Sequence, residues 1–291
     1  MKDFNYYAPT EVVFGEQSEE QVAALVRKYG GTKVLVHYGG KSAERSGLLD
    51  KICGLLDEGG VAYVKLGGVV PNPRLSLAKK GIELCRQEGV DFILAVGGGS
   101  VIDSAKCIAY GVCMEDDVWD LYLGKVEAPK TMLPVACVLT IPAAGSEMSE
   151  ASVITNADAP RESGGRLLPG GTKLGYSNNM SRPKFAIMNP RRTMTLPPYQ
   201  TAAGVTDMMM HIFERYFTKD DDMDLTTNLA EATLRTIKDA VFAVLKNPED
   251  YRYRAQIMWG GSVAHWGCWA RAFRKTGPPT SWNTSSAVCS T

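Results

Sequence analysis

A glycine-rich turn that joins a buried strand to a helix is the feature that most constrains the fold of this chain. The apolar run 92–96 precedes the turn, the segment 101–106 continues it as a helix, and the turn itself consists of Gly97, Gly98, Gly99 and Ser100. Glycines allow a close approach of the backbone, and a helix N-terminus directs N–H groups at an anion. Because a glycine run is a weak motif by itself, the turn predicts either a phosphate cradle or a tight turn that binds nothing.

Strand and helix patterns alternate through about the first 190 residues. Strands are predicted at 33–38, 62–66, 92–96 and 134–140, and helices at 43–56, 76–88 and 100–110. Strands that are separated by helices of this length form a parallel, doubly wound sheet. We therefore predict an α/β fold, with a Rossmann-like, doubly wound parallel sheet in an N-terminal domain over residues 1–190.

Glycine and hydroxyl residues follow three of these strands. Gly39 and Gly40 come after strand 33–38, the glycine turn comes after strand 92–96, and Thr140 ends strand 134–140. Ligands of open α/β sheets bind beyond the carboxyl ends of the strands. We therefore expect these residues to line one crevice.

The pattern changes from about Pro197 onward. Glycine becomes rarer, and helical patterns cover 199–217, 225–245 and 251–266. This composition predicts a separate, all-helical second domain over residues 191–291.

Asp207 and His211 are the candidate metal ligands of this second domain. Their i, i+4 spacing places both side chains on one face of a helix, where a carboxylate and an imidazole can supply two ligands to a divalent ion. The flanking residues are apolar, and a buried Asp needs a partner. A hydrogen-bonded Asp–His pair inside a helical core is therefore the alternative interpretation.

Composition excludes several classes of partner. The 32 acidic and 32 basic residues balance, so a nucleic-acid partner is not expected. No apolar segment follows the first residues as in a secretory signal, and no run reaches the ~18 apolar residues of a membrane span, so we expect no membrane partner. The seven cysteines contain no C-x-x-C pair, which favours a reduced, cytoplasmic setting.

Several motifs in order resemble one family, the iron-containing (group III) alcohol dehydrogenases, in particular their butanol dehydrogenase and aldehyde reductase branch. The resemblance covers residues 1 to about 267 and is carried by Tyr7–Thr10, Val13–Gly15, Tyr38–Gly40, Pro71–Pro73, Gly97–Asp103, Leu139–Glu147, Leu196–Pro198, the Asp207/His211 helix and Gln256–Trp259. It implies an NAD(P)-binding domain followed by a helical metal-binding domain. The alternative on the same scaffold is a glycerol dehydrogenase-like relative.

The resemblance also implies roles for individual residues. The glycine turn (Gly97, Gly98, Gly99, Ser100) and Asp103 would hold the pyrophosphate; Gly39, Gly40 and Ser42 would face the adenosine ribose; Thr140, Ser146 and Lys173 would contact the nicotinamide end. No acidic residue stands at 39–42, and Lys41 does, so NADP(H) is favoured over NAD(H).

The implied reaction is hydride transfer between NAD(P)H and a small primary alcohol or aldehyde, such as butanol and butanal. An Fe²⁺ or Zn²⁺ ion would act as a Lewis acid on the substrate oxygen. The alternative is a non-catalytic nucleotide-binding fragment. A homodimer is also among the expected partners.

Residues 268–291 form an atypical tail. The resemblance implies Asp207, His211 and two further histidines as metal ligands, yet no histidine follows His265, which is expected to be an ordinary helix histidine. In the frame that starts at the third base of the Gly267 codon, the tail can spell the continuation that the family would have, including one histidine. We therefore hypothesise a frameshifted reading with early termination, which leaves the helical domain truncated.

Overall fold

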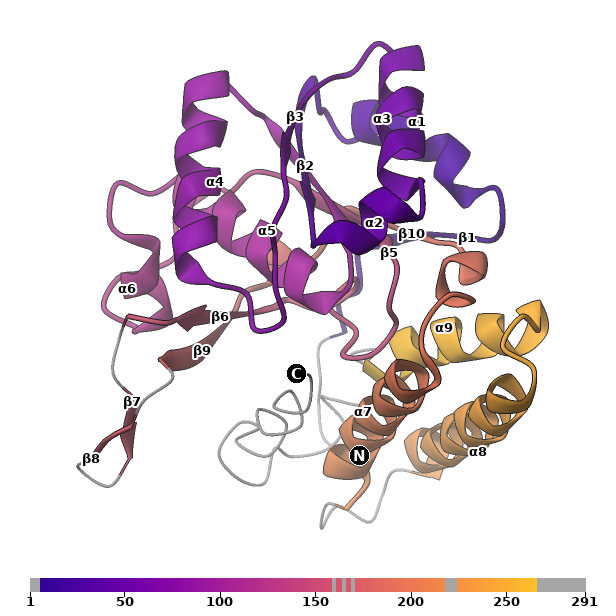
Figure 1. The fold of residues 1–291 in the computed structure, drawn as a ribbon. Coiled ribbons are helices and arrows are strands. Elements are labelled where there is room, and N and C mark those ends of the chain that lie inside the picture. The colour runs from indigo at the N-terminus through magenta and orange to yellow at the C-terminus, as the bar shows by residue number, and fades with distance from the viewer. Residues whose placement is uncertain (1–5, 159–160, 164–165, 169–170, 218–223, 266–291) are drawn as a thin grey trace.

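A six-stranded parallel sheet forms the centre of the structure, a computed structural model that describes residues 6–158, 161–163, 166–168, 171–217 and 224–265. The strand order is β1–β10–β5–β4–β2–β3 (Figure 1). The strands are β1 (Glu11–Phe14), β2 (Lys33–Tyr38), β3 (Ala62–Leu66), β4 (Phe92–Gly97), β5 (Val135–Leu139) and β10 (Phe185–Met188). The predicted α/β fold with a parallel sheet is confirmed.

Helices cover both faces of this sheet, which is why its central strands are apolar throughout. Residues of β4 alternate between two cores: Leu94 packs with α1 (Val22–Lys28) and α3 (Leu48–Glu58), and Ile93 packs with α4 (Leu75–Glu88) and α5 (Gly99–Val112). Every residue of β4 is buried, as expected for a strand between two helical layers.

The sheet changes direction between β2 and β4. From β2 the chain pairs outward with β3 and then crosses back through α4 to β4, which lies on the other side of β2. The loops after β2 and β4 therefore begin side by side at the carboxyl edge. Such a switch point is where open α/β sheets bind their ligands.

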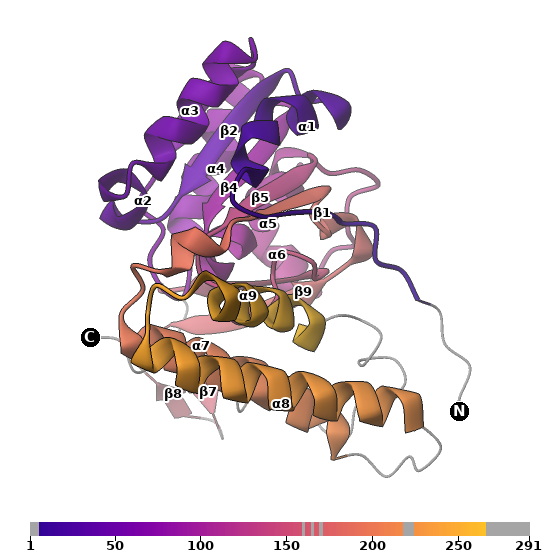
Figure 2. The same ribbon diagram turned by 90° about the vertical axis from the view of Figure 1, so that its right-hand side faces the viewer.

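Three helices follow the sheet and pack against each other: α7 (Pro198–Tyr216), α8 (Asp224–Lys246) and α9 (Tyr251–His265). Both views show them on one side of the sheet unit (Figures 1 and 2). A Cβ on Gly260 would lie 2.4 Å from Ile237 Cγ2, and one on Gly261 would lie 2.7 Å from the Met208 methyl, so these glycines let α9 approach α8 and α7 closely. No described helix is long and apolar enough to cross a membrane.

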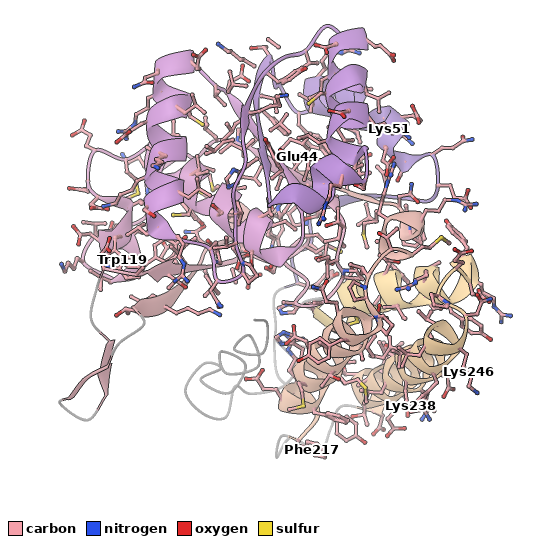
Figure 3. All side chains as sticks on the ribbon, in the orientation of Figure 1. Glu44, Lys51, Trp119, Phe217, Lys238 and Lys246 are labelled. Carbon is pink, nitrogen blue, oxygen red and sulfur yellow. The ribbon has the colours of Figure 1, made fainter. Side chains whose placement is uncertain are left out.

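The outer surface of these helices is partly apolar. Figure 3 labels Phe217, Lys238 and Lys246 on this part of the molecule. Phe217 and Leu225 are exposed at 72% and 68%, and Phe242 at 60%. Apolar side chains thus stand beside lysines on the surface of the helical unit.

An antiparallel hairpin lies between β5 and β10 in the chain and packs on α4 and α5, and its strands are not predicted by the sequence pattern. It consists of β6 (Ala151–Asn156) and β9 (Thr172–Ser177), with Thr155 opposite Lys173. The remaining described elements are α6 (Val118–Tyr122), the strands β7 (Arg161–Ser163) and β8 (Arg166–Leu168), and three short 3-10 helices at Ser18–Gln21, Asn179–Ser181 and Pro190–Thr193.

One predicted helix is wrong in extent. The pattern predicts a single helix over 43–56, but the structure has α2 (Lys41–Arg45) and then α3. Gly47, which precedes α3, adopts a φ of 70°, and a left-handed residue ends a helix. A single glycine between two segments of helical composition does not interrupt the apolar spacing, so the sequence pattern does not show where the helix ends.

Candidate functional site

The glycine turn caps α5 at the carboxyl end of β4. The N–H groups of Val101 and Ile102 donate to Gly98 O, at 3.0 and 3.2 Å, so Gly98 is the last residue before the helix. In the first helical turn, N–H groups have no acceptor within the helix and can donate to a ligand. A Cβ on Gly99 would lie 3.2 Å from Ser146 Oγ, so the 140–150 loop closes over the turn.

Gly39 and Gly40 stand next to this turn. The Gly39 carbonyl accepts a hydrogen bond from the Gly68 N–H at 3.0 Å, and a Cβ on Gly39 would lie 3.7 Å from Val101 Cγ2. A Cβ on Gly40 would meet nothing within 4 Å. The side chains of residues 41–42, including Ser42, lie outside the part of the chain that the structure describes. The structure thus brings two glycine turns together at the switch point.

Thr140 and Ser146 belong to the loop that follows β5. The Thr140 N–H donates to Gly97 O at 3.0 Å, which ties the start of this loop to the glycine turn. Ser146 is buried, and its hydroxyl faces Gly99 as described above. Both residues therefore lie beside the turn.

Asp103 is one helical turn into α5. Its Oδ2 accepts a hydrogen bond from the Val153 N–H at 3.1 Å, whereas its Oδ1 is buried and has no hydrogen-bond partner among the described residues. Burial raises the pKa of this carboxyl, and the positive charge of Lys106, the Val153 N–H, the Ser146 hydroxyl and the charge of Lys173 oppose the shift. An unpartnered buried acceptor indicates a missing donor, such as a ligand or a water.

Lys106 is a buried cation that the sequence pattern does not single out. Its Nζ donates to three carbonyl oxygens, at 2.9 Å to Ser146, 2.8 Å to Ser149 and 2.8 Å to Ala151. The side chain is fully buried, which lowers its pKa to about 8. Lys106 therefore fastens the 146–151 segment to α5.

The same loop seats the helical unit. Glu147 is buried and its Oε1 accepts a hydrogen bond from the Ser262 hydroxyl of α9 at 2.5 Å; burial raises its pKa. Gly145, at a φ of 68°, faces His265, because a Cβ there would lie 2.2 Å from His265 Cβ. A Cβ on Gly204 of α7 would lie 2.8 Å from Pro142 O. We call this set of contacts the sheet–helix junction.

Lys173 lies on β9 at this junction. Its Nζ donates to Asn72 Oδ1 at 2.8 Å. Burial lowers the pKa of this lysine, and the carboxylates of Asp103 and Asp207 oppose the shift. Lys173 is therefore within electrostatic reach of one acidic residue on the sheet side and one on the helical side.

Asp207 and His211 share one face of α7, as predicted, with 3.8 Å between Asp207 Oδ2 and His211 Nε2. Burial raises the pKa of Asp207 to about 6 and lowers that of His211 to about 4. Within the described ranges, no group of three or more His, Cys, Asp or Glu residues is arranged to hold a metal ion. The pair therefore offers two ligands.

His265 is the last residue of α9, and it has a neighbour that the sequence does not predict. Its ring lies edge-on to His211, with 4.4 Å between the ring centroids, and burial lowers its pKa well below the usual value. The close approach of α9 to α7 and to Gly145 brings His265 there. Sequence spacing cannot show this contact, because it depends on how two helices pack.

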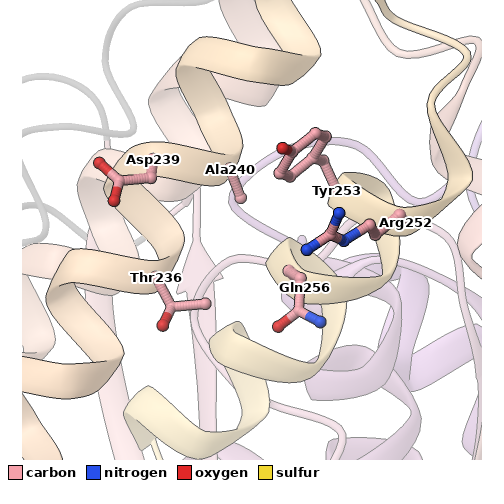
Figure 4. A pocket seen from close by; sticks show the side chains of 6 residues that line it. All are labelled: Thr236, Asp239, Ala240, Arg252, Tyr253 and Gln256. Carbon is pink, nitrogen blue, oxygen red and sulfur yellow. The ribbon is translucent and has the colours of Figure 1, made fainter.

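A separate shallow pocket lies between α8 and α9, away from the junction (Figure 4). Its lining consists of Thr236, Asp239, Ala240, Arg252, Tyr253 and Gln256. None of the predicted cofactor or metal residues lines it, so we assign it no role in the site.

Two family models match the chain. One, described as iron-containing alcohol dehydrogenase, matches residues 9–190, and the other, described as the C-terminal part of the Fe-containing alcohol dehydrogenase family, matches residues 201–277. The second match extends past Gly267, where the motifs of the resemblance end. The structure does not describe residues 266–291, so the hypothesis of a shifted reading frame lies outside it.

Curated relatives and a solved structure are similar to the chain. A probable NADH-dependent butanol dehydrogenase of Bacillus subtilis is 41% identical over 91% of this chain and 64% of its own length. An NADPH-dependent aldehyde reductase of Escherichia coli is 34% identical over 91% and 65%. The structure of an NADH-dependent butanol dehydrogenase A from Thermotoga maritima, 35% identical, matches with a TM-score of 0.87 over 94% and 66%. The chain thus spans about two thirds or less of the length of these proteins.

Proposed function

We propose that this chain, which belongs to the iron-containing alcohol dehydrogenase family, binds a nicotinamide dinucleotide at the sheet–helix junction and serves hydride transfer between NAD(P)H and a small primary alcohol or aldehyde. One observation carries the proposal. The glycine turn at the switch point begins the helix that carries Asp103, whose buried Oδ1 has no hydrogen-bond partner among the described residues, and Lys173 is within electrostatic reach of both Asp103 and Asp207.

The residues present fit the dinucleotide. The first turn of α5, with Gly97, Gly98, Gly99 and Ser100, would hold the pyrophosphate through N–H groups, and Asp103 would accept a hydrogen bond from the ligand. Gly39, Gly40 and Ser42 would face the adenosine ribose; Thr140, Ser146 and Lys173 would face the nicotinamide end. When bound, the dinucleotide would supply the hydride, and these residues would place it.

Within this proposal NADP(H) is the favoured coenzyme. The chain has Lys41 and no acid at 39–42, and a 2′-phosphate requires a base without a nearby acid. The butanol dehydrogenases reported above are named NADH-dependent and the aldehyde reductase NADPH-dependent, so relatives of both kinds exist. Titration with each coenzyme decides between them.

The metal fits this chain only in part. Asp207 and His211 would supply two ligands to Fe²⁺ or Zn²⁺, and among the described residues no third ligand joins them. Two ligands are fewer than catalytic sites use. We therefore derive no metal-dependent step, and this observation favours a second candidate function, a nucleotide-binding unit without turnover of its own.

Isothermal calorimetry of the full chain with NADPH and NADH tests the proposal. We expect saturable binding of one dinucleotide per chain. The variant Gly99→Asp places a carboxylate where the pyrophosphate would lie and should abolish binding, whereas Gly54→Asp, on α3 with open space around it, should leave binding intact. Absence of binding to the unaltered chain would refute the proposal. Turnover of butanal with either coenzyme would separate the two candidate functions.

A further inference from the structure

Asn72 has an unusual backbone. It is the only non-glycine residue with a positive φ, 57°, in the described part of the chain. Left-handed backbone is uncommon outside glycine, although Asn tolerates it better than most residues. Pro73 follows and disfavours the right-handed helical region for Asn72. Such local strain tends to persist where the surrounding structure over-determines it, often at functional sites.

The Asn72 segment is fastened to the β6–β9 hairpin at two points. The Thr155 N–H of β6 donates to Pro73 O at 2.9 Å, and the Lys173 ammonium of β9 donates to Asn72 Oδ1 at 2.8 Å. Thr155 and Lys173 are paired across the hairpin. The main-chain hydrogen bond from Thr155 to Pro73 therefore holds the Asn72 segment next to the strand that carries Lys173, so that the side-chain hydrogen bond can form.

Lys173 has two carboxylates within electrostatic reach. Burial lowers its pKa, and Asp103 and Asp207 both act against this shift. A lysine side chain is a compact charge on a flexible stem, so an unrestrained ammonium would move to a carboxylate. The Asn72 amide oxygen accepts its hydrogen bond instead and so restrains the ammonium.

We propose that Asn72 is a positioning residue that holds the Lys173 ammonium where the nicotinamide end of a pyridine dinucleotide binds. The inference rests on the proposed function. The left-handed backbone and the hydrogen bonds to the β6–β9 hairpin hold the Asn72 amide against the Lys173 ammonium. Asn72 thus acts on the dinucleotide only through Lys173.

A double-mutant cycle on the full chain tests this role. The dissociation constant for NADPH, and for NADH, is measured for the unaltered chain, Asn72→Gly, Lys173→Met and the double variant. Glycine retains the left-handed backbone and removes only the amide. We expect Asn72→Gly to weaken binding about tenfold, the size that loss of one hydrogen bond to a charged group produces. The double variant should bind as Lys173→Met does.

Three results of this cycle would overturn the inference. Effects that add in the double variant would overturn the inference, because Asn72 would then act without Lys173. Unchanged affinity in Asn72→Gly would overturn it and leave the proposed function standing. Failure of the unaltered chain to bind either coenzyme would overturn both.

Two further variants separate positioning from folding. Asn72→Asp retains an acceptor oxygen and tolerates the left-handed backbone, so we expect its affinity to stay within about threefold of the unaltered chain. A loss as large as that of Asn72→Gly would contradict the inference. Asn178→Gly removes an amide that accepts the Met180 N–H at 3.0 Å at a short helix elsewhere; it should lower thermal stability without changing affinity.

Discussion

The sheet unit and the helical unit of this chain differ in how completely they bury their apolar residues. In the sheet unit, β4 and β5 are buried along their whole length between helical layers. In the helical unit, large apolar side chains remain exposed on all three helices or at their ends, namely Met210, Phe217, Leu225, Leu229, Phe242, Leu245 and Trp259. The sheet unit thus has a core of its own, whereas the helices present a surface suited to further packing.

The two units also contribute unequally to the candidate site. The sheet side offers a helix N-terminus, two glycine turns and an orphaned carboxyl oxygen, which together suit a dinucleotide. The helical side offers Asp207 and His211 as ligands, with no third ligand in the described segments. This difference implies that nucleotide binding and metal binding are separable properties of this chain. The following predictions test how independent the two units are.

Replacement of Lys106, in the sheet unit, should produce the largest loss of stability. Lys106→Met removes the donor to the buried carbonyl oxygens of Ser146 and Ser149 and to the part-buried one of Ala151, so we expect the free energy of unfolding to fall by about 3–5 kcal/mol in denaturant titrations. Lys80→Met, at an exposed position of α4, is the matched control and should leave stability unchanged. An equal loss in both variants would contradict the role of Lys106.

Acid should destabilise the sheet unit through His37. Its ring is buried between Leu66 O and Ser104 Oγ, and burial lowers its pKa from 6.5 to about 4. Between these values the unfolded chain binds the proton and the folded chain does not. The contribution is therefore present above pH 6.5 and is lost as the pH falls toward 4, by about 3 kcal/mol. We compare the unfolding free energy of the unaltered chain with that of His37→Gln across this pH window. The unaltered chain should lose stability relative to the variant as the pH falls, and a difference independent of pH would contradict the role of His37.

A substitution at Gly145 should weaken the contact between the two units. Gly145 and Gly124 share a φ of 68°, but a Cβ on Gly145 would meet His265, whereas one on Gly124 would meet nothing within 4 Å. Gly124→Ala should cost about 1 kcal/mol of backbone strain, and Gly145→Ala about 3 kcal/mol, because the overlap adds to the strain. Thermal unfolding measures both. Equal losses would show that α9 does not pack on Gly145.

The smallest effect on stability should come from the exposed face of the helical unit. Phe242→Glu replaces a side chain that is 60% exposed, so we expect the unfolding free energy to change by less than about 0.5 kcal/mol while self-association decreases. Light scattering against protein concentration measures the association. Lys238→Gln, on the same helix, also lowers the net charge by one and is the control for the change of charge. Equal reduction by both variants would assign the association to charge.

The sequence pattern predicts the central strands well, because β2, β4 and β5 are long apolar runs bounded by turns. It does not reveal β1 and β10, which have four residues each, or the β6–β9 hairpin, whose strands are largely polar. The boundary between domains at 190/191 stays a proposal.

The candidate site follows the same division. The glycine turn and the Asp207/His211 spacing are local signals, so they are visible in the sequence. Lys106 and Asn72 contact partners that lie 40 and 101 residues away, at Ser146 and Lys173. No local pattern marks Lys106, and the Pro71–Pro73 motif marks Asn72 without revealing its partner. The contact of His265 with His211 likewise depends on tertiary packing.

A crystal structure of the full chain with NADPH tests the central claim most directly. We predict that the pyrophosphate lies against the first turn of α5, in contact with the N–H groups of Gly99 and Ser100, and that the nicotinamide end lies beside Lys173. A dinucleotide bound elsewhere on the chain, or none at saturating concentration, would contradict the account.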